Sequence, residues 1–275
     1  MSNCESCSSS SSCNKEKCNK LSTKYGNIKN IIGVISGKGG VGKSTITGIL
    51  ATQLKKSGYK VGVLDADITG PSMPRFFGIN KKRAQMIPIT DQNVKFIPVE
   101  TEMGIKVISI NLLIEGEDDP VIWRGPVITG ALNQMYEDTV WDDLDYLLID
   151  MPPGTADIAL TVMQSFPIKS MVVVSTPQDM VSMIVKKVVT MIEKLNVPIL
   201  GVVENMSYVE CGNCGEKIPV FSKKSGKEQA QYLGIPLLQE LPIDLDLVEN
   251  LENGKAESYI EASPKYESLL KSINL

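Results

Sequence analysis

Short, almost uninterrupted runs of hydrophobic residues recur along this chain, separated by segments with helical spacing. Runs rich in Val, Ile and Leu are typical of strands buried on both faces of a parallel sheet. Hydrophobic residues repeated at a helical period predict amphipathic helices between several of them. We therefore expect strands at residues 28–36, 60–67, 105–114, 145–150, 170–175, 197–205 and 235–242, and helices at 43–58, 179–195, 223–233 and 244–253.

This alternation predicts an α/β fold with a mostly parallel, doubly wound sheet covered by helices on both faces. The chain has 275 residues and is 43% hydrophobic, which is enough for one sizeable core. We place a single domain at residues 27–275. Residues 1–26 are polar, so we expect a disordered, cysteine-rich tail there. In sheets of this kind ligands bind beyond the carboxyl ends of the strands.

Charge and hydropathy narrow the range of partners. The net charge is −4 and no basic block is present, which argues against nucleic-acid binding. We find neither a secretory signal nor a run long enough to span a membrane, so we expect a cytoplasmic protein. Residues 263–275 have helical spacing without a basic face, which favours a helix packed on the domain over one bound to lipid.

The absence of histidine excludes several classes of site. Ser-His and Cys-His nucleophile pairs and zinc sites with imidazole ligands are all ruled out. A soft-metal site must therefore use cysteine, and paired cysteines in a reducing compartment indicate metal or redox chemistry. The six cysteines are Cys4, Cys7, Cys13, Cys18, Cys211 and Cys214.

The strongest motif is the segment SGKGGVGKST at residues 36–45. It satisfies G-x-x-x-x-G-K-S/T between a predicted strand and a predicted helix, which is the context of a phosphate-binding loop. The backbone N–H groups would surround the phosphates, Lys43 would reach the β- and γ-phosphates, and the Ser44 hydroxyl would bind Mg2+. The candidate nucleotide contacts in this loop are Gly37, Lys38, Gly39, Gly40, Val41, Gly42, Lys43, Ser44 and Thr45.

Two carboxylates follow other predicted strands. Asp150, in LLIDMPPG, is placed to hold a metal-bound water, and Gly154 would let the backbone approach the γ-phosphate. Asp67, in DADITGPS, is placed to orient the attacking water. Either aspartate alone would also fit a helix cap or a turn. Together with the loop they predict a nucleotide-hydrolysing site.

Lys38 is a second lysine in the loop, and its spacing leaves two interpretations open. It either points to solvent or adds positive charge where the γ-phosphoryl group becomes negative in the transition state. The segment KGGVGKST resembles the deviant Walker A motif of the MinD and ParA ATPases. That resemblance implies an ATP-binding homodimer in which Lys38 reaches the partner's nucleotide. It also implies catalytic roles for Lys43, Asp67 and Asp150, and adenine recognition by Asn205.

Cys211 and Cys214 form a C-x-x-C pair in a loop after a predicted strand. Two thiolates fill only half of a zinc or iron-sulfur site, which usually has four ligands. The same loop of a second copy, meeting at a two-fold axis, would complete it. The alternatives are a redox dithiol, half of a zinc knuckle and an unliganded turn.

Longer stretches resemble one subfamily, the Mrp/ApbC iron-sulfur cluster carriers. They are DADITGPSMPRFFG, residues 123–157, STPQD and ENMSYVECGNCG, and the likeness covers about residues 26–275. The resemblance implies a 4Fe-4S cluster held between the Cys211 and Cys214 pairs of two subunits and transferred to apo-proteins. Gly212 stands where that family often has proline.

The tail cysteines allow two interpretations. Cys4, Cys7, Cys13 and Cys18 could form a complete four-thiolate site for a cluster or for zinc, or belong to a flexible arm. The sequence therefore favours an ATPase that carries a cluster. The alternatives are a MinD/ParA-like nucleotide switch with a structural zinc site, and an electron carrier.

Overall fold

The structure is a computed structural model, and it describes residues 20–68, 70–90, 93–114, 125–222 and 224–273. The strands within these ranges are β1 (Tyr25–Ser36), β2 (Val61–Asp65), β3 (Gln85–Thr90), β4 (Asn93–Ile97), β5 (Val99–Glu100), β6 (Lys106–Ile108), β7 (Val140–Asp150), β8 (Ser170–Ser175), β9 (Ile199–Glu210), β10 (Lys217–Pro219) and β11 (Leu237–Pro242).

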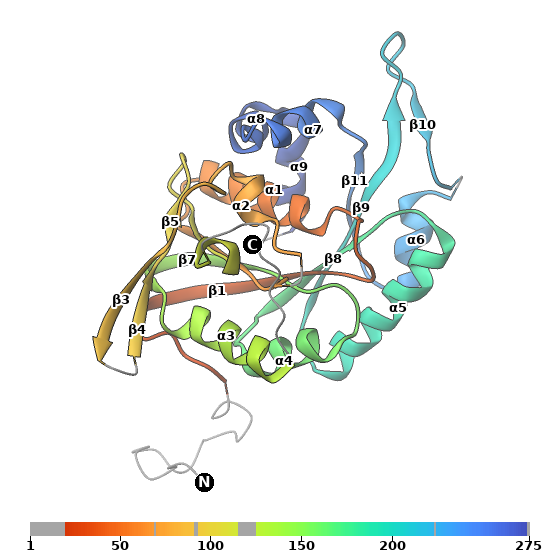
Figure 1. The fold of residues 1–275 in the computed structure, drawn as a ribbon. Helices are drawn as coiled ribbons and strands as arrows, with labels where there is room; N and C mark the ends of the chain where they lie inside the picture. The colour runs from red at the N-terminus through yellow and green to blue at the C-terminus, as the bar shows by residue number, and fades with distance from the viewer. Residues whose placement is uncertain (1–19, 69, 91–92, 115–124, 223, 274–275) are drawn as a thin grey trace.

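One large sheet of nine strands dominates the described residues (Figure 1). Its order is β10-β9-β8-β1-β7-β2-β6-β5, and β11 also pairs with β9. The pairings are parallel except those of β5 with β6 and of β10 with β9. The mostly parallel α/β fold that the hydrophobic runs predict is thus confirmed.

Helices cover both faces of this sheet (Figure 1). One layer contains α1, α2, α7, α8 and α9, and the other contains α3, α4, α5 and α6. Their bounds are α1 (Lys43–Lys56), α2 (Met73–Phe76), α3 (Gly125–Glu137), α4 (Asp157–Ser165), α5 (Asp179–Lys194), α6 (Gly226–Leu233), α7 (Leu245–Glu252), α8 (Ala256–Ala262) and α9 (Glu267–Ser272), with 3-10 turns at Ile110–Leu112 and Pro264–Tyr266.

The central strands are buried where the sequence predicts it. The last six residues of β1 and the last five of β7 are all buried, as expected for strands covered on both faces. The expected strand at 105–114 is shorter, because β6 pairs with β2 only as far as Ile108 and the chain then turns into a 3-10 helix. In contrast, β9 continues five residues beyond the expected end at 205.

Two segments were not anticipated by the hydrophobic pattern. β3 and β4 form a separate two-stranded sheet, and all six residues of β3 are exposed. Residues 20–24, assigned to the tail by composition, are hydrogen-bonded to the domain: the Leu21 and Lys24 amides donate to the carbonyls of Ser165 and Glu137. The cysteines at positions 4, 7, 13 and 18 lie outside the described residues.

The C-terminal segment packs on the domain, as the sequence favours. Tyr266, Leu269 and Ile273 are buried, and α9 lies against α1 and β11. Among the helices in the described ranges, none combines the length and the apolar character that crossing a bilayer requires.

Candidate functional site

The phosphate-binding loop connects the end of β1 to the start of α1. Gly40 and Gly42 adopt φ values of 78° and 83°, in the left-handed region that favours glycine. Gly42 is the N-cap residue of α1, and no side chain caps the helix there. The backbone N–H groups of the first turn are therefore directed at the position where a phosphate would bind.

Lys43 lies among carboxylates at the base of this loop. Its Nζ is 2.7 Å from Asp150 Oδ2 and 3.6 Å from Asp67 Oδ2. The Lys43 side chain is only 7% exposed and that of Asp150 is fully buried. In such surroundings a charge is tolerated because it is paired and hydrogen-bonded. The parallel register of β1, β7 and β2 brings these residues together, since Asp150 lies opposite both Val34 and Asp65.

Two hydroxyl groups of α1 complete the surroundings of Asp150. Ser44 Oγ donates to Asp150 Oδ2 at 2.6 Å, and Thr47 Oγ1 donates to Asp150 Oδ1 at 2.8 Å. A serine hydroxyl beside carboxylate oxygens is the kind of hard-oxygen donor set that Mg2+ prefers. Ser44 and Asp150 therefore fit the magnesium site of a nucleotide-binding protein.

Asp65 is a third carboxylate at this edge, and the sequence assigned it no role. Its Oδ2 accepts from Ser109 Oγ at 3.1 Å and from the Met73 amide at 3.3 Å, and its Oδ1 accepts from the Asp67 amide at 3.3 Å. Burial, together with the nearby Asp150 carboxylate, raises the pKa of Asp65 to about 7. Asp65 thus fixes the segment that carries Asp67. Its place at the end of a buried strand was the only sequence signal for this position.

Gly154 follows Asp150 and lies next to the phosphate-binding loop. Its φ is 80°, and its amide donates to the Ser36 carbonyl at 2.7 Å. A Cβ atom added at this position would lie 3.5 Å from the Gly37 carbonyl oxygen. The backbone after β7 therefore runs close to the loop, and the approach of Gly154 to a γ-phosphate stays a prediction.

Lys38 lies on the exposed part of the loop, away from the aspartates. Its Nζ donates to Gln178 Oε1 at 3.2 Å, and Gln178 is the N-cap residue of α5. Lys43 makes the ion pairs with the site carboxylates, whereas Lys38 has its contact at the rim. Its ammonium group therefore lies at the exposed rim of the loop.

A cavity of about 340 Å3 adjoins the loop on the side of β9 and β11, and we call it the base cavity. Asn205 lines it and donates from Nδ2 to the Val41 carbonyl at 2.9 Å. A Cβ at Gly42 would lie 2.2 Å from that Nδ2, so only glycine allows this approach. The cavity is also lined by Gly40, Thr45, Ile49, Met206, Leu241, Pro242, Ile243, Asp244, Leu247, Val248, Leu251 and Tyr266.

Asp244 stabilises one wall of the base cavity. Its carboxylate accepts hydrogen bonds from the Tyr259 and Tyr266 hydroxyls and from Lys265 Nζ, the last at 2.7 Å. It also caps α7 by accepting from the Leu247 amide. The C-terminal helices thus hold the end of β11 in place. The sequence shows none of this, because the partners are only brought together by the fold.

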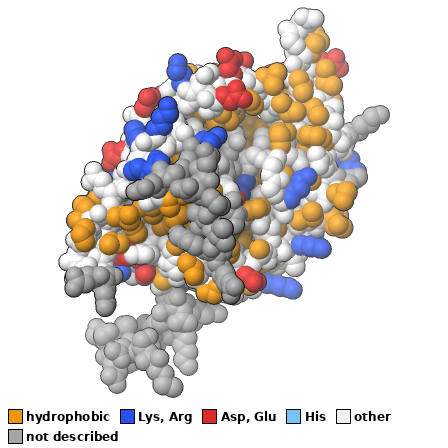
Figure 2. All heavy atoms as spheres, viewed as in Figure 1, with side chains coloured by type: hydrophobic (Ala, Val, Ile, Leu, Met, Phe, Trp, Pro, Cys, Tyr) orange, Lys and Arg blue, Asp and Glu red, His pale blue; other side chains and the backbone are white. Residues whose placement is uncertain are grey.

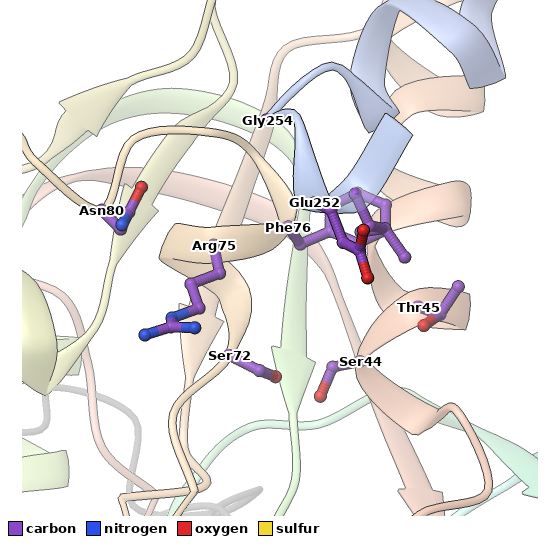
Figure 3. A pocket seen from close by; sticks show the side chains of 9 residues that line it. Ser44, Thr45, Ser72, Arg75, Phe76, Asn80, Glu252 and Gly254 are labelled. Atoms are coloured by element: carbon purple, nitrogen blue, oxygen red, sulfur yellow. The ribbon is translucent and has the colours of Figure 1, made fainter. Parts of the chain in front are cut away.

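A second cavity, of about 490 Å3, lies on the other side of Ser44 and Thr45 (Figure 3). Ser72, Arg75 and Phe76 line it from α2 and the turn before it, and Glu252 lines it from α7. Two glycines allow close packing around this cavity. A Cβ at Gly48 would lie 2.0 Å from the Phe76 ring, and one at Gly78 would lie 2.3 Å from the Gly254 carbonyl oxygen. The segment after Asp67 is therefore packed tightly against α1 and the α7–α8 connection.

The cysteine pair lies in the turn between β9 and β10, whose hairpin projects from the sheet (Figure 1). We call residues 208–219, which comprise the end of β9, the turn and β10, the cysteine arm. The Cys211 amide donates to the Glu216 carbonyl and the Gly215 amide to the Cys211 carbonyl, so the turn is hydrogen-bonded. Cys214 is exposed and Cys211 is partly exposed. Hydrogen bonds from the backbone amides of Asn213 and Cys214 lower the pKa of the Cys211 thiol.

Comparison with known proteins settles the family. A family model described as ParA, NUBPL iron-transfer P-loop NTPase, matches residues 27–274. The chain belongs to this NUBPL iron-transfer P-loop NTPase family. The membership predicted from the motifs is confirmed.

Relatives and solved structures agree with this NUBPL-family assignment. An iron-sulfur cluster carrier protein of Clostridium perfringens is 68% identical over 272 residues, which cover 98% of this chain and 95% of that protein. The nucleotide-binding protein of Archaeoglobus fulgidus, solved in complex with ADP, is 42% identical with a TM-score of 0.73, covering 87% of this chain and 90% of that one. The MinD ATPase of Pyrococcus furiosus shares the fold at 22% identity and a TM-score of 0.62, covering 90% and 98%.

In this NUBPL-family chain the predicted site residues form two groups. The loop with Ser44, the aspartates Asp67 and Asp150, and Asn205 gather at the carboxyl ends of the central strands. The Cys211 and Cys214 pair lies apart from them, on the arm. Among the described residues, no group of three or more cysteine, aspartate or glutamate side chains is arranged to hold a metal ion. A metal held by the arm thiols therefore needs ligands from elsewhere.

Proposed function

We propose that this protein is an ATP-binding and ATP-hydrolysing carrier of iron-sulfur clusters in the cytoplasm. It holds a 4Fe-4S cluster between the cysteine arms of two identical chains and transfers the cluster to apo-proteins. The observation that carries this proposal is the half-site on the arm. Two accessible thiols lie at an exposed tip, and the described part of the chain offers no third metal ligand beside them.

The arm is suited to meet a second copy of itself. A 4Fe-4S cluster takes four thiolates, and a two-fold axis through the arm tips would supply two from each chain. The arm and the segment after it carry exposed apolar side chains, which Figure 2 shows as a patch at this end of the molecule. They are Val209, Ile218, Val220 and Phe221, between 37% and 51% exposed. Pairing the arms would remove this apolar surface from water.

The position of the cluster suits transfer. A cluster held by exposed thiols at the tip of a hairpin lies within reach of ligands on an acceptor protein. The lowered pKa of the Cys211 thiol favours the thiolate form that binds iron. An electron carrier would instead be expected to enclose its cluster, because burial tunes the potential.

The ATPase activity belongs to the nucleotide site. Lys43 would contact the β- and γ-phosphates, and Ser44 with Asp150 would hold Mg2+, which neutralises charge on the phosphates. Asp67 would orient the attacking water, and Asn205 would contact the adenine. Lys38 would reach the partner's nucleotide, where its charge stabilises the transition state. Its exposed place on the loop rim supports this role.

The alternative is a MinD/ParA-like nucleotide switch with a structural zinc site. Such a switch would need a surface for its membrane or DNA partner. The buried side of α9 disfavours membrane attachment through the C-terminal segment, since Leu269 and Ile273 are packed into the domain. The arm thiols also favour the carrier, because a structural zinc site is usually closed and buried.

The deciding experiment is anaerobic reconstitution of the full chain with iron and sulfide. We expect charge-transfer absorption in the visible range, about two iron atoms per chain and a dimeric mass by light scattering. The C211S/C214S double variant should lose the arm cluster and the iron bound to it. A protein that binds only zinc, or that stays monomeric with nucleotide and iron both present, would contradict the proposal.

The same variant addresses the tail. It retains Cys4, Cys7, Cys13 and Cys18, so iron that remains after loss of the arm thiols reports a cluster in the tail. If no iron remains, the tail cysteines hold no cluster. The matched variant with serine at the four tail positions should keep the arm cluster in either case.

A further inference from the structure

β9 consists of two parts, one in the central sheet and one in the cysteine arm. Residues 199–204 lie in the core of the sheet between β8 and β11. From Tyr208 the strand pairs with β10 and leads to Cys211 at the arm tip. The same strand thus connects the nucleotide-binding sheet to the thiols.

A bulge separates the two parts. Glu240 and Pro242 of β11 lie opposite Glu204 and Tyr208 of β9, so a step of two residues on β11 faces a step of four on β9. Residues 205–207 of β9 thus lie opposite the single residue Leu241 of β11, an excess of two residues. The Ser207 hydroxyl donates to the Glu204 carbonyl at 3.0 Å and closes this bulge. Bulges next to functional sites typically re-aim side chains and end regular pairing.

Met206 occupies the strained position in the bulge. Its φ is 54°, in the left-handed region that residues other than glycine seldom adopt. In a regular strand, Asn205 and Met206 would point to opposite faces of the sheet. In the bulge both residues line the base cavity.

The bulge is attached on both sides. Towards the nucleotide site, Asn205 Nδ2 donates to the Val41 carbonyl of the phosphate-binding loop. Towards the arm, the Ile243 amide donates to the Tyr208 carbonyl at 2.8 Å and the Val220 amide to the Ser207 carbonyl at 3.4 Å. A change in the bulge therefore reaches the loop at one end and the first residues of the arm at the other.

We propose that the bulge at residues 205–207 is the joint through which nucleotide in the base cavity orders the cysteine arm of the same chain. Met206 is the positioning residue, because its left-handed backbone sets the direction in which the arm leaves the sheet. The inference rests on the proposed nucleotide site. A nucleotide that contacts Asn205 and Met206 favours one arrangement of the bulge, and it shifts the arm by its difference in affinity between arrangements.

The test measures alkylation rates of Cys211 and Cys214 in the full-length, metal-free protein under anaerobic conditions. Iodoacetamide is the probe, and mass spectrometry of the arm peptide separates these thiols from those of the tail. Saturating Mg-ADP should slow alkylation by about fivefold or more, a typical size for coupling between two sites. Nucleotide binding is measured separately by calorimetry.

Three variants distinguish the effect of the Met206 backbone conformation from that of its side chain. M206G permits the left-handed conformation but frees the backbone, so at an ADP concentration that calorimetry shows to saturate this variant the slowing of alkylation should fall to near onefold. M206N changes the side chain but tolerates the left-handed region, so the slowing should persist. N196G is the matched control, because Asn196 has the same φ of 54° just before β9 and should retain the slowing.

The outcomes distinguish this inference from the proposed function. If ADP binds the parent protein and leaves the alkylation rates unchanged, or if M206G retains the full slowing, the joint is refuted while the nucleotide site stands. If ADP does not bind the parent at all, the proposed nucleotide site fails and the inference falls with it.

Discussion

Asp150 shows how a single carboxylate organises the phosphate-binding site. Both of its oxygens accept hydrogen bonds or ion pairs from α1, through Lys43, Ser44 and Thr47. The carboxylate is fully buried, so removing any of these partners would leave charge or hydrogen-bonding capacity unsatisfied. The same contacts tie the end of β7 to the start of α1. At the scale of residues, binding chemistry and stability therefore depend on the same side chain.

Glu204 presents the opposite case, a buried carboxyl group without a cationic partner. Neither of its oxygens has a hydrogen bond of good geometry, and the nearby Ser175 hydroxyl offsets only part of the effect of burial. Burial, with the carboxylate of Glu240 nearby on β11, raises the pKa of Glu204 from 4.5 to about 7. The unfolded chain thus releases this proton at lower pH than the folded chain does. Stability should fall as the pH rises from 4.5 to 7 and remain at the lower level above it.

We expect Glu204→Gln to remove this contribution. The variant should be more stable than the parent at pH 8, by about 3 kcal/mol, and the difference should shrink towards pH 4.5. Urea unfolding across this pH range provides the measurement. Glu210→Gln, an exposed change on the same strand, is the control and should leave the pH dependence unaltered. A variant with the parent's pH dependence would show that Glu204 titrates normally.

At the scale of elements, the contact between α1 and α2 determines where the segment after Asp67 lies. Gly48 of α1 allows the ring of Phe76 to approach the helix backbone. α2 has only four residues and depends on this packing for its position. The geometry of the nucleotide site therefore depends on a glycine one helical turn away from the phosphate-binding loop.

Gly48→Ala tests this contact. The new Cβ would lie 2.0 Å from the Phe76 ring, so we expect a loss of stability of about 1–3 kcal/mol and weaker nucleotide binding. Gly130→Ala in α3 is the matched control, because nothing lies within 4 Å of its Cβ position. That change should stabilise the protein by about 0.5–1 kcal/mol. Equal effects of the two substitutions in urea unfolding would contradict the packing argument.

The cysteine arm is the second element whose surface can be tested. Ile218 lies on β10, is 51% exposed and pairs with Val209 across the arm. Ile218→Glu would place a charge on the surface proposed to meet the second copy, so the dimer should weaken by tenfold or more, or about 1.4 kcal/mol. Ile89→Glu changes an isoleucine of similar exposure, 48%, on the distant β3. Light scattering of cluster-loaded protein should show dissociation of the first variant alone.

At the scale of the whole molecule, the fold was predictable because its sheet is buried on both faces. Continuous apolar runs mark β1, β7 and β8 without ambiguity. The β3–β4 hairpin gave no such signal, since β3 is exposed on both faces. The continuation of β9 into the arm was also missed, because the bulge ends the buried pattern at Asn205.

The candidate site likewise contains residues that the sequence indicates and residues that it does not. The phosphate-binding loop, Asp67, Asp150 and Asn205 were candidates in the sequence because each lies at or just after the end of a buried strand, and the register of the sheet brings them together. The contributions of Asp65 and Asp244 depend on partners distant in sequence, such as Ser109 and Tyr266. Their residue types alone fit a turn or a cap equally well.

The proposed role of Lys38 is a property of two chains and calls for a mixing experiment. Lys38→Ala and Lys43→Ala should each abolish ATP hydrolysis. In a mixed dimer the site of the Lys38→Ala chain keeps its own Lys43 and receives Lys38 from its partner. Equal mixing should thus restore about a quarter of the parent's activity, because half of the dimers are mixed and each has one working site. Activity that stays at zero in verified mixed dimers would contradict action across the axis.

The exposed turn at the arm tip has a chemical consequence. An exposed thiol is open to oxidation by peroxide. Oxidation of the Cys211 thiolate would give a sulfenic acid, and attack by the neighbouring Cys214 thiol would release water and form a disulfide. Both thiols would then be lost as metal ligands. Protein prepared in air would therefore carry the Cys211–Cys214 disulfide. This disulfide would have to be reduced before the protein could be loaded with iron.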